Sequence, residues 1–185
     1  RGVASGFWFN AGGESCAQVN ITEDGNVVVI TGHPDIGGSR ASIANITAEL
    51  LGIDVNRVSV LIGDTASIGF SNLTGGSRVL FASAMVVTES TKQVVDILKQ
   101  RAAKIWEIDE DAVNWENGEA RPAGDNAGQF KPLTLAEIAD KATPTGGPIG
   151  AGHQVNTVGA EGGFATHICD VEVDIEAEET ETEEI

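Results

Sequence analysis

A four-residue motif occurs twice in the sequence, as Gly37-Gly38-Ser39-Arg40 and as Gly75-Gly76-Ser77-Arg78. In each copy the two glycines let the main chain approach a ligand closely, and serine is a preferred residue at the start of a helix. The first turn of a helix offers unpaired N–H groups and the positive end of the helix dipole, which together favour an anion. The repeated motif therefore predicts two anion-binding turns, which could hold opposite parts of one extended anionic cofactor.

Ordinary helix capping is the competing explanation of the same motif. A Gly-Gly-Ser sequence is common where a loop leads into a helix, and neither copy matches the GxGxxG or GxxxxGK[ST] patterns of dinucleotide and P-loop sites. Arg40 and Arg78 could each pair with a surface acid or contact a phosphate group. The motif alone therefore leaves both a structural and a ligand-binding role open for the two loops.

Apolar periodicity predicts the elements that position the two copies. Residues 15–31 alternate as a β-hairpin that turns at Asp24-Gly25, and the apolar run at 58–62 is typical of a buried strand. A helix is predicted over 39–51, with Gly52 as its C-terminal cap. A longer helix begins at Ser77 and carries an apolar stripe to residue 105. Each copy of the motif thus opens a helix that follows a strand.

Smaller elements are predicted in the second half of the chain. Residues 113–120 form a hairpin, and Thr134 with Glu137 makes a capping-box pattern for a short helix. Residues 143–163, rich in Gly, Pro and Thr, indicate a loop, and 167–174 alternate as a final strand. The order of elements predicts an α+β fold of two layers, with helices packed on a mixed β-sheet.

Length and charge distribution indicate one domain with an acidic end. The 185 residues suit a single domain, which we place at 1–174. Eight of the 28 acidic residues lie between Glu172 and Glu184, so residues 175–185 are expected to be a disordered acidic tail or a non-native end. Because the chain begins at Arg1, we expect an excised domain or a processed fragment.

Composition excludes several kinds of partner and site. A net charge of −17 is unsuited to binding nucleic acid or an anionic membrane surface, and no apolar run is long enough for membrane insertion. Two cysteines outside any CxxC pair favour a reducing, cytoplasmic location. The three histidines, His33, His153 and His167, lack the spacing of metal ligands, so no protein metal ligand is predicted.

Five short motifs follow one another in order: DG at 24–25, GHPDIGG at 32–38, AELLGI at 48–53, GDT at 63–65 and GGSR at 75–78. This series resembles the molybdopterin-binding region of the xanthine dehydrogenase and aldehyde oxidase family, and 167–174 resembles the family strand that follows. The resemblance runs in order from residue 1 to residue 174. It implies a fold like that of a molybdenum cofactor-binding domain.

The resemblance also implies a cofactor, a reaction and partners. Members of the family bind molybdenum–molybdopterin in their large subunit, in bacteria often as the cytosine dinucleotide form, and oxidise aldehydes or N-heteroaromatics with oxygen from water. Iron–sulfur clusters and FAD would lie on other domains or subunits, which with the remainder of the large subunit would be the partners. The implied cofactor-binding residues, completed by the neighbouring members of each motif, are Ile36, Gly37, Gly38, Ser39, Gly75, Gly76, Ser77 and Arg78.

Two departures from the family pattern limit what this chain should do alone. Gly38 stands where the family often has a glutamine that hydrogen-bonds an oxo ligand of the metal. The family's catalytic glutamate belongs to a downstream Gly-Glu-Pro motif that this sequence does not contain, so no catalytic residue is assigned and the fragment alone is expected to be inactive.

One alternative is a non-catalytic α+β subunit-interaction module whose glycine loops are only helix caps. Another is a stand-alone anion- or nucleotide-binding protein.

Overall fold

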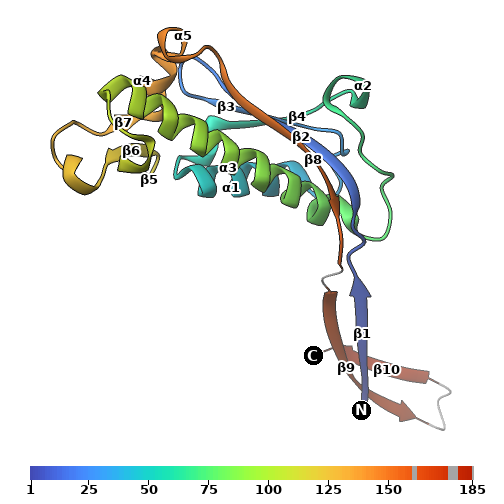
Figure 1. Cartoon of the computed structure of the whole chain (residues 1–185). Coiled ribbons are helices and arrows are strands. Elements are labelled where there is room, and N and C mark those ends of the chain that lie inside the picture. The colour runs from blue at the N-terminus through green and yellow to red at the C-terminus, as the bar shows by residue number, and fades with distance from the viewer. Residues whose placement is uncertain (160–161, 175–178, 185) are drawn as a thin grey trace.

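A mixed four-stranded sheet with two helices on one face forms the body of the chain (Figure 1). The structure is a computed structural model that describes residues 1–159, 162–174 and 179–184. The strands, in spatial order, are β4 (Val58–Ile62), β3 (Val27–Thr31), β2 (Gly13–Ile21) and β8 (Ile149–Thr157). β2 runs antiparallel to both β3 and β8, whereas β3 and β4 are parallel.

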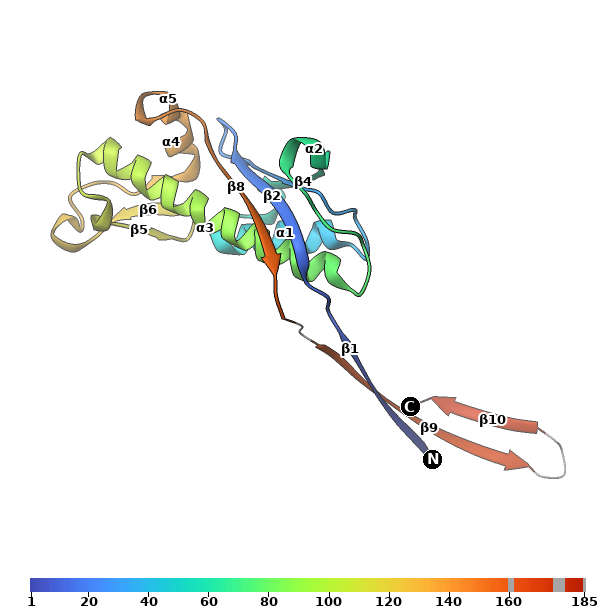
Figure 2. The same ribbon diagram turned by 45° about the vertical axis from the view of Figure 1, so that its right-hand side comes forward.

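The two helices of the body begin at the same end of the sheet. α1 (Ser39–Leu51) connects the parallel strands β3 and β4 as a crossover. After β4, the short helix α2 (Thr65–Ile68) and a loop lead into α3 (Arg78–Trp106). Because each helix follows one of two parallel strands, both start at the carboxyl ends of those strands, and Figures 1 and 2 show them running side by side. This topology brings the two glycine motifs to one end of the molecule.

The apolar stripe of α3 is buried in the core. Val86, Val94 and Leu98 on this helix are fully buried and pack in one cluster with Val29 of β3 and Ile43 of α1. The stripe recurs at helical spacing, which is why the sequence predicts this helix correctly. The long helix is therefore a central packing element, and its apolar face is not the free contact face that the interaction-module alternative requires.

A small subdomain closes the far ends of the two helices. It contains η1 (Val55–Arg57), η2 (Glu110–Ala112), β5 (Val113–Glu116), β6 (Glu119–Pro122), η3 (Gly124–Asn126), β7 (Leu133–Thr134), α4 (Leu135–Asp140) and α5 (Ala142–Thr145). Trp106 at the end of α3 stacks on Phe130 with ring centroids 5.9 Å apart. The indole N–H of Trp115 donates to the carbonyl of Leu51, the last residue of α1, at 3.0 Å. These contacts fix the helix ends opposite the glycine motifs.

A three-stranded antiparallel arm projects from the body (Figures 1 and 2). It is formed by β1 (Gly2–Phe9), β9 (Gly162–Asp174) and β10 (Glu179–Glu184), in the order β1-β9-β10. The sequence patterns do not predict β1. Residues 179–184 belong to the segment for which an acidic tail is predicted, whereas 175–178 and 185 lie outside the described residues. The domain boundary at residue 174 stays a prediction.

The predicted α+β fold with helices on a mixed sheet is confirmed, although several elements, β1 and β8 among them, are not predicted. The two hairpins, both long helices and the capping box of Thr134 and Glu137 lie where the sequence places them. The predicted loop at 143–163 is wrong over 149–157, because β8 pairs along all nine of its residues with β2, and residues 160–161 lie outside the described residues. Gly150 and Gly152 in β8 lie against the side chains of Asn20 and Gln18, which occupy the space that a Cβ atom would need. The glycines therefore belong to a tightly covered strand rather than to a loop.

β4 differs from the buried strand that its composition predicts. Val58 is nearly buried, but Leu61 and Ile62 are 52% and 43% exposed. β4 is the edge of the four-stranded sheet, and Leu61 near its carboxyl end lines an open cavity between this strand and α1. Apolar residues at this end are thus left accessible beside the glycine motifs.

Replacing Leu98 by alanine is expected to lower the free energy of unfolding by about 3 kcal/mol, because the residue is fully buried in the core. The matched control is Leu80→Ala on the same helix, where the side chain is 42% exposed and a loss below about 1 kcal/mol is expected. Urea unfolding measures both values. Equal losses in the two variants would contradict the assignment of the core.

Candidate functional site

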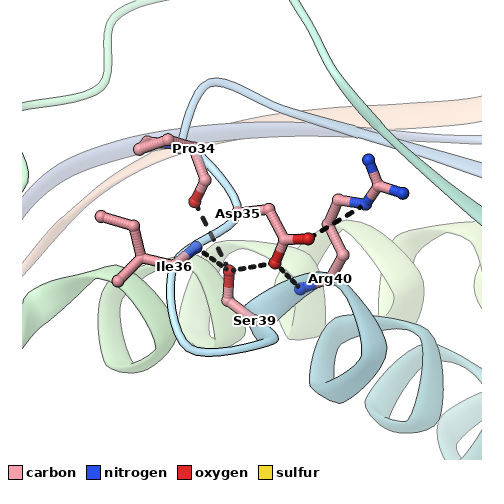
Figure 3. Close-up of polar contacts among 5 residues, drawn as sticks. All are labelled: Pro34, Asp35, Ile36, Ser39 and Arg40. Carbon is pink, nitrogen blue, oxygen red and sulfur yellow. Dashed lines mark hydrogen bonds and ion pairs between the residues drawn. The ribbon is translucent and has the colours of Figure 1, made fainter.

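The loop before α1 is closed by its own side chains (Figure 3). A carboxylate oxygen of Asp35 accepts a hydrogen bond from the backbone N–H of Arg40 at 3.1 Å, and the other lies 3.5 Å from the Arg40 guanidinium. The backbone N–H of Ser39 donates to the carbonyl of Ile36 at 3.2 Å, and the N–H of Ile36 donates to the Ser39 hydroxyl at 3.3 Å. A carboxylate therefore already caps the first turn of α1.

Gly37 and Gly38 present open main chain at the tip of this loop. Both have positive φ, 62° and 73°, and a Cβ atom at either position would meet nothing within 4 Å. Within the described part of the chain, no acceptor takes the N–H of either residue. Gly38 also lines an open cavity of about 550 Å³ between α1 and β4. The loop can therefore approach an external group closely through its backbone.

The loop before α3 ends without a comparable cap. Ser77 is the N-cap residue, with a φ of 57°, but its hydroxyl makes no capping hydrogen bond, and the first turn of α3 contains no acidic residue. The first N–H groups of any helix lack partners within the helix. No side chain therefore compensates the positive end of the α3 helix dipole. The start of α3 is better suited to an anion than the start of α1.

The Arg78 side chain points inward and is bonded entirely to its own chain. It is 3% exposed, and its five N–H groups match five acceptors: the Ser15 hydroxyl and the carbonyls of Gly12, Glu14, Asn72 and Leu73. These distances lie between 2.6 and 3.2 Å. Because a guanidinium has only five N–H donors, this side chain positions the loop and has none left for a ligand.

A buried hydrogen-bonded bridge joins the two loops. The Ser15 hydroxyl on β2 lies 3.0 Å from Arg78 and 2.9 Å from Nε2 of His33, which belongs to the loop before α1. Since Arg78 can only donate, the Ser15 hydroxyl accepts from it and also forms a hydrogen bond with Nε2 of a neutral His33 imidazole. Burial, followed by the charge of Arg78, lowers the pKa of His33 to about 4. His33 thus connects the loop before α1 to Ser15 of β2, which also binds Arg78 at the start of α3.

The structure brings the predicted binding residues together only in part. Residues 36–39 and 75–78 lie at the same end of the sheet, but the lining of the cavity beside Gly38 does not include residues 75–78. The expectation that serine side chains cap both helices is wrong: the N-cap of α1 is Gly38, and Ser77 makes no cap bond. Sequence reasoning missed Asp35, whose position before the helix was a usable signal, and Ser15, for which no local signal existed.

Among the residues that the structure describes, no group of three or more His, Cys, Asp or Glu side chains is arranged to hold a metal ion. No helix in the same part of the chain combines the length and the apolar character needed to cross a bilayer.

The stability of the chain should depend on pH through His33. Its folded pKa, about 4, lies below the unfolded value of 6.5, so its contribution is present above pH 6.5 and is lost as pH falls towards 4. Between pH 7.5 and pH 5 the wild type should lose about 2 kcal/mol more than His33→Gln, measured by urea unfolding. His167→Gln on the exposed arm is the control and should follow the wild type. A His33→Gln profile parallel to that of the wild type would contradict the buried bridge.

Comparison with known proteins identifies the family. The family model described as "Molybdopterin cofactor-binding domain" matches residues 1–185. The chain is 41% identical over 67 residues to the aldehyde oxidoreductase molybdenum-binding subunit PaoC of Escherichia coli K12, which is 36% of this chain and 9% of that protein. It is 33% identical over 86 residues to a nicotinate dehydrogenase subunit of Pseudomonas putida, 46% of this chain and 7% of that protein.

A solved structure shows the same fold over nearly the whole chain. It is a Cu,Mo-CO dehydrogenase in its carbon monoxide reduced state, which matches with a TM-score of 0.84 and 20% identity. The alignment covers 98% of this chain but only 25% of that one, so the chain spans a small part of each of these relatives. Because the family model covers the whole sequence, the chain belongs to the molybdopterin cofactor-binding domain family of molybdenum hydroxylase large subunits.

Proposed function

We propose that this chain is a fragment of the large subunit of a molybdenum hydroxylase and contributes part of the cradle for its molybdenum–molybdopterin cofactor. The complete enzyme oxidises aldehydes or N-heteroaromatics in the cytoplasm, with oxygen derived from water, and the fragment alone is inactive. The relatives named as an aldehyde oxidoreductase subunit and a nicotinate dehydrogenase subunit support these two substrate classes. Iron–sulfur clusters and FAD lie on other domains or subunits.

One observation carries the proposal: two helix starts, preceded by the positive-φ glycines Gly37 and Gly38 in one case and Gly76 in the other, lie at the same end of one sheet. The fit to an anionic cofactor is better at α3, whose first turn lacks both a side-chain cap and an acidic residue. The fit at α1 is of another kind, because Asp35 caps the helix and only the Gly37 and Gly38 backbone remains open. The donor set consists of neutral amides, which suits a phosphate group even in a chain of net charge −17.

Each predicted residue takes a defined part in this arrangement. The start of α3 at Ser77 would hold the phosphate of the cofactor, in the cytosine dinucleotide form its pyrophosphate, while Gly75 and Gly76 shape the turn. The Gly37 and Gly38 amides would face the metal end, with Ile36 exposed beside them. Ser39 and Arg78 act as positioning residues, because their side chains bond within the chain. When bound, the cofactor supplies the redox chemistry of the hydroxylation.

The two alternatives differ from this proposal in what they require of the loops. If the glycine loops were only caps, the serine hydroxyls would be expected to bond the first turns, and Ser77 does not do so. A stand-alone anion-binding protein would bind its ligand without further polypeptide. The match to a quarter of a much longer chain favours a part of a large subunit.

Changing the charge at the start of α3 tests anion binding directly. Ser77→Asp should lower the affinity for the cofactor roughly fivefold, because a carboxylate at the N-cap repels the phosphate while it stabilises the helix. Ser77→Asn is the matched control, since asparagine has the same shape, tolerates positive φ and carries no charge. Molybdenum and pterin content are measured in the complete large subunit. Equal loading of the Asp and Asn variants would contradict a phosphate at this helix.

A side chain at Gly38 should block the approach of the cofactor to the first loop. Gly38→Asn is expected to reduce molybdenum content severalfold with little loss of stability, because asparagine tolerates positive φ and the site is open. Gly128→Asn is the control, since Gly128 also has positive φ and open space but lies in the far subdomain. If both variants load as the wild type does, the first loop does not contact the cofactor.

A further inference from the structure

Ser15 is a fully buried serine of β2 that bonds to both glycine loops. Its hydroxyl lies 2.9 Å from Nε2 of His33 in the loop before α1 and 3.0 Å from the Arg78 guanidinium at the start of α3. Among the residues that the structure describes, Nδ1 of the same imidazole is buried without a hydrogen-bond partner. The bond to Ser15 is therefore the one hydrogen bond that holds the His33 ring.

The next residue along β2 contacts the loop before α3 from the other face of the sheet. Cys16 points to the face opposite to Ser15, because side chains alternate along a strand. Its backbone N–H donates to the Ser71 hydroxyl at 3.2 Å. A Cβ atom at Gly32, the first residue after β3, would lie only 2.6 Å from the same hydroxyl. Two adjacent residues of β2 thus hold the two loops, and the loops also pack directly against each other.

The Ser15 hydroxyl links the position of one loop to that of the other. Without it, Nε2 of His33 and one N–H of Arg78 would each lack a partner in the folded chain. Both side chains are buried, so water cannot replace the lost bonds without movement of a loop. A buried polar group left without a partner is more costly than an ordinary hydrogen bond is favourable. The bridge therefore favours one relative placement of the two loops.

We propose that Ser15 is a positioning residue for the cofactor, whose hydroxyl sets the spacing between the open backbone at Gly37 and Gly38 and the start of α3. This inference rests on the proposed function. Ser15 and His33 are buried and do not themselves contact the cofactor. They act by holding both loops in place before it binds, because a loop that must be ordered on binding reduces the affinity.

Molybdenum and pterin content of the complete large subunit tests this role in four single variants. Ser15→Ala should lower the content roughly fivefold. Ser90→Ala is the matched control and should not, because it removes an equally buried hydroxyl that bonds a carbonyl of its own helix at 2.9 Å. His33→Leu should behave as Ser15→Ala does, since leucine offers the hydroxyl no partner. His33→Gln should retain most of the content, because its amide can take the place of Nε2.

Two results of this comparison would overturn the inference. One is equal loading of all four variants. The other is an equal loss in His33→Leu and His33→Gln, because the loss would then come from the shape of the side chain and not from its hydrogen bond to Ser15.

Amide hydrogen exchange of the complete subunit without cofactor tests the coupling of the loops. The N–H of Arg40 bonds a carboxylate of the loop before α1, and the N–H of Asn72, in the loop before α3, bonds the carbonyl of Glu14. Both amides should exchange about tenfold faster in Ser15→Ala and at the wild-type rate in Ser90→Ala. Faster exchange at only one of the two amides would overturn the inference, because the loops would then be independent.

The same measurements distinguish failure of this inference from failure of the proposed function. If Ser15→Ala loads molybdenum as the wild type does while Gly38→Asn does not, the first loop binds the cofactor without the help of Ser15, and only the inference is refuted. If Ser15→Ala, Gly38→Asn and Ser77→Asp all load as the wild type does, the proposed cradle is refuted and the inference with it.

Discussion

The buried guanidinium of Arg78 is the interaction on which the candidate site depends. A charge removed from water costs several kcal/mol unless hydrogen bonds replace its hydration, and none of the acceptors bonded to this one is a carboxylate. Four backbone carbonyls and the Ser15 hydroxyl replace the water. Each acceptor must therefore stay in place, which fixes the base of the arm, the loop before α3 and the first residues of β2 relative to one another. Through Ser15, the same constraint reaches His33 and the loop before α1.

The two copies of the Gly-Gly-Ser-Arg motif show how context changes the role of identical residues. In the first copy, Arg40 lies on the surface beside Asp35, whose carboxylate caps α1. In the second copy, Arg78 is buried, and the first turn of α3 contains no acidic residue. The residues before the motif decide this difference, because only the first loop has an aspartate shortly before its glycines, at Asp35. The two copies thus leave different groups open, glycine backbone in the first and the start of a helix without a side-chain cap in the second.

Local patterns predict the hairpins, the two long helices and the capping box, and long-range contacts account for what they do not predict. Hairpins, helices and the capping box depend on residues close in sequence, so Asp24-Gly25, Thr134 and Glu137 were sufficient signals. The Gly, Pro and Thr content of this stretch predicts a loop, whereas the glycines of β8 make room for side chains of β2 that lie more than a hundred residues away in sequence. The bridge from Ser15 to His33 and Arg78 likewise joins separate elements. Nothing in the neighbourhood of Ser15 in the sequence indicates that it connects two loops.

In the proposed arrangement, the two helix starts form one cradle for an anionic cofactor. The most direct measurement is amide hydrogen exchange of residues 36–38 and 78–80 in the complete large subunit, purified with and without molybdenum–molybdopterin. Both segments should exchange more slowly when the cofactor is bound, while residues 55–57 in the far subdomain keep their rates. Unchanged exchange in both segments on cofactor binding would contradict a shared cradle.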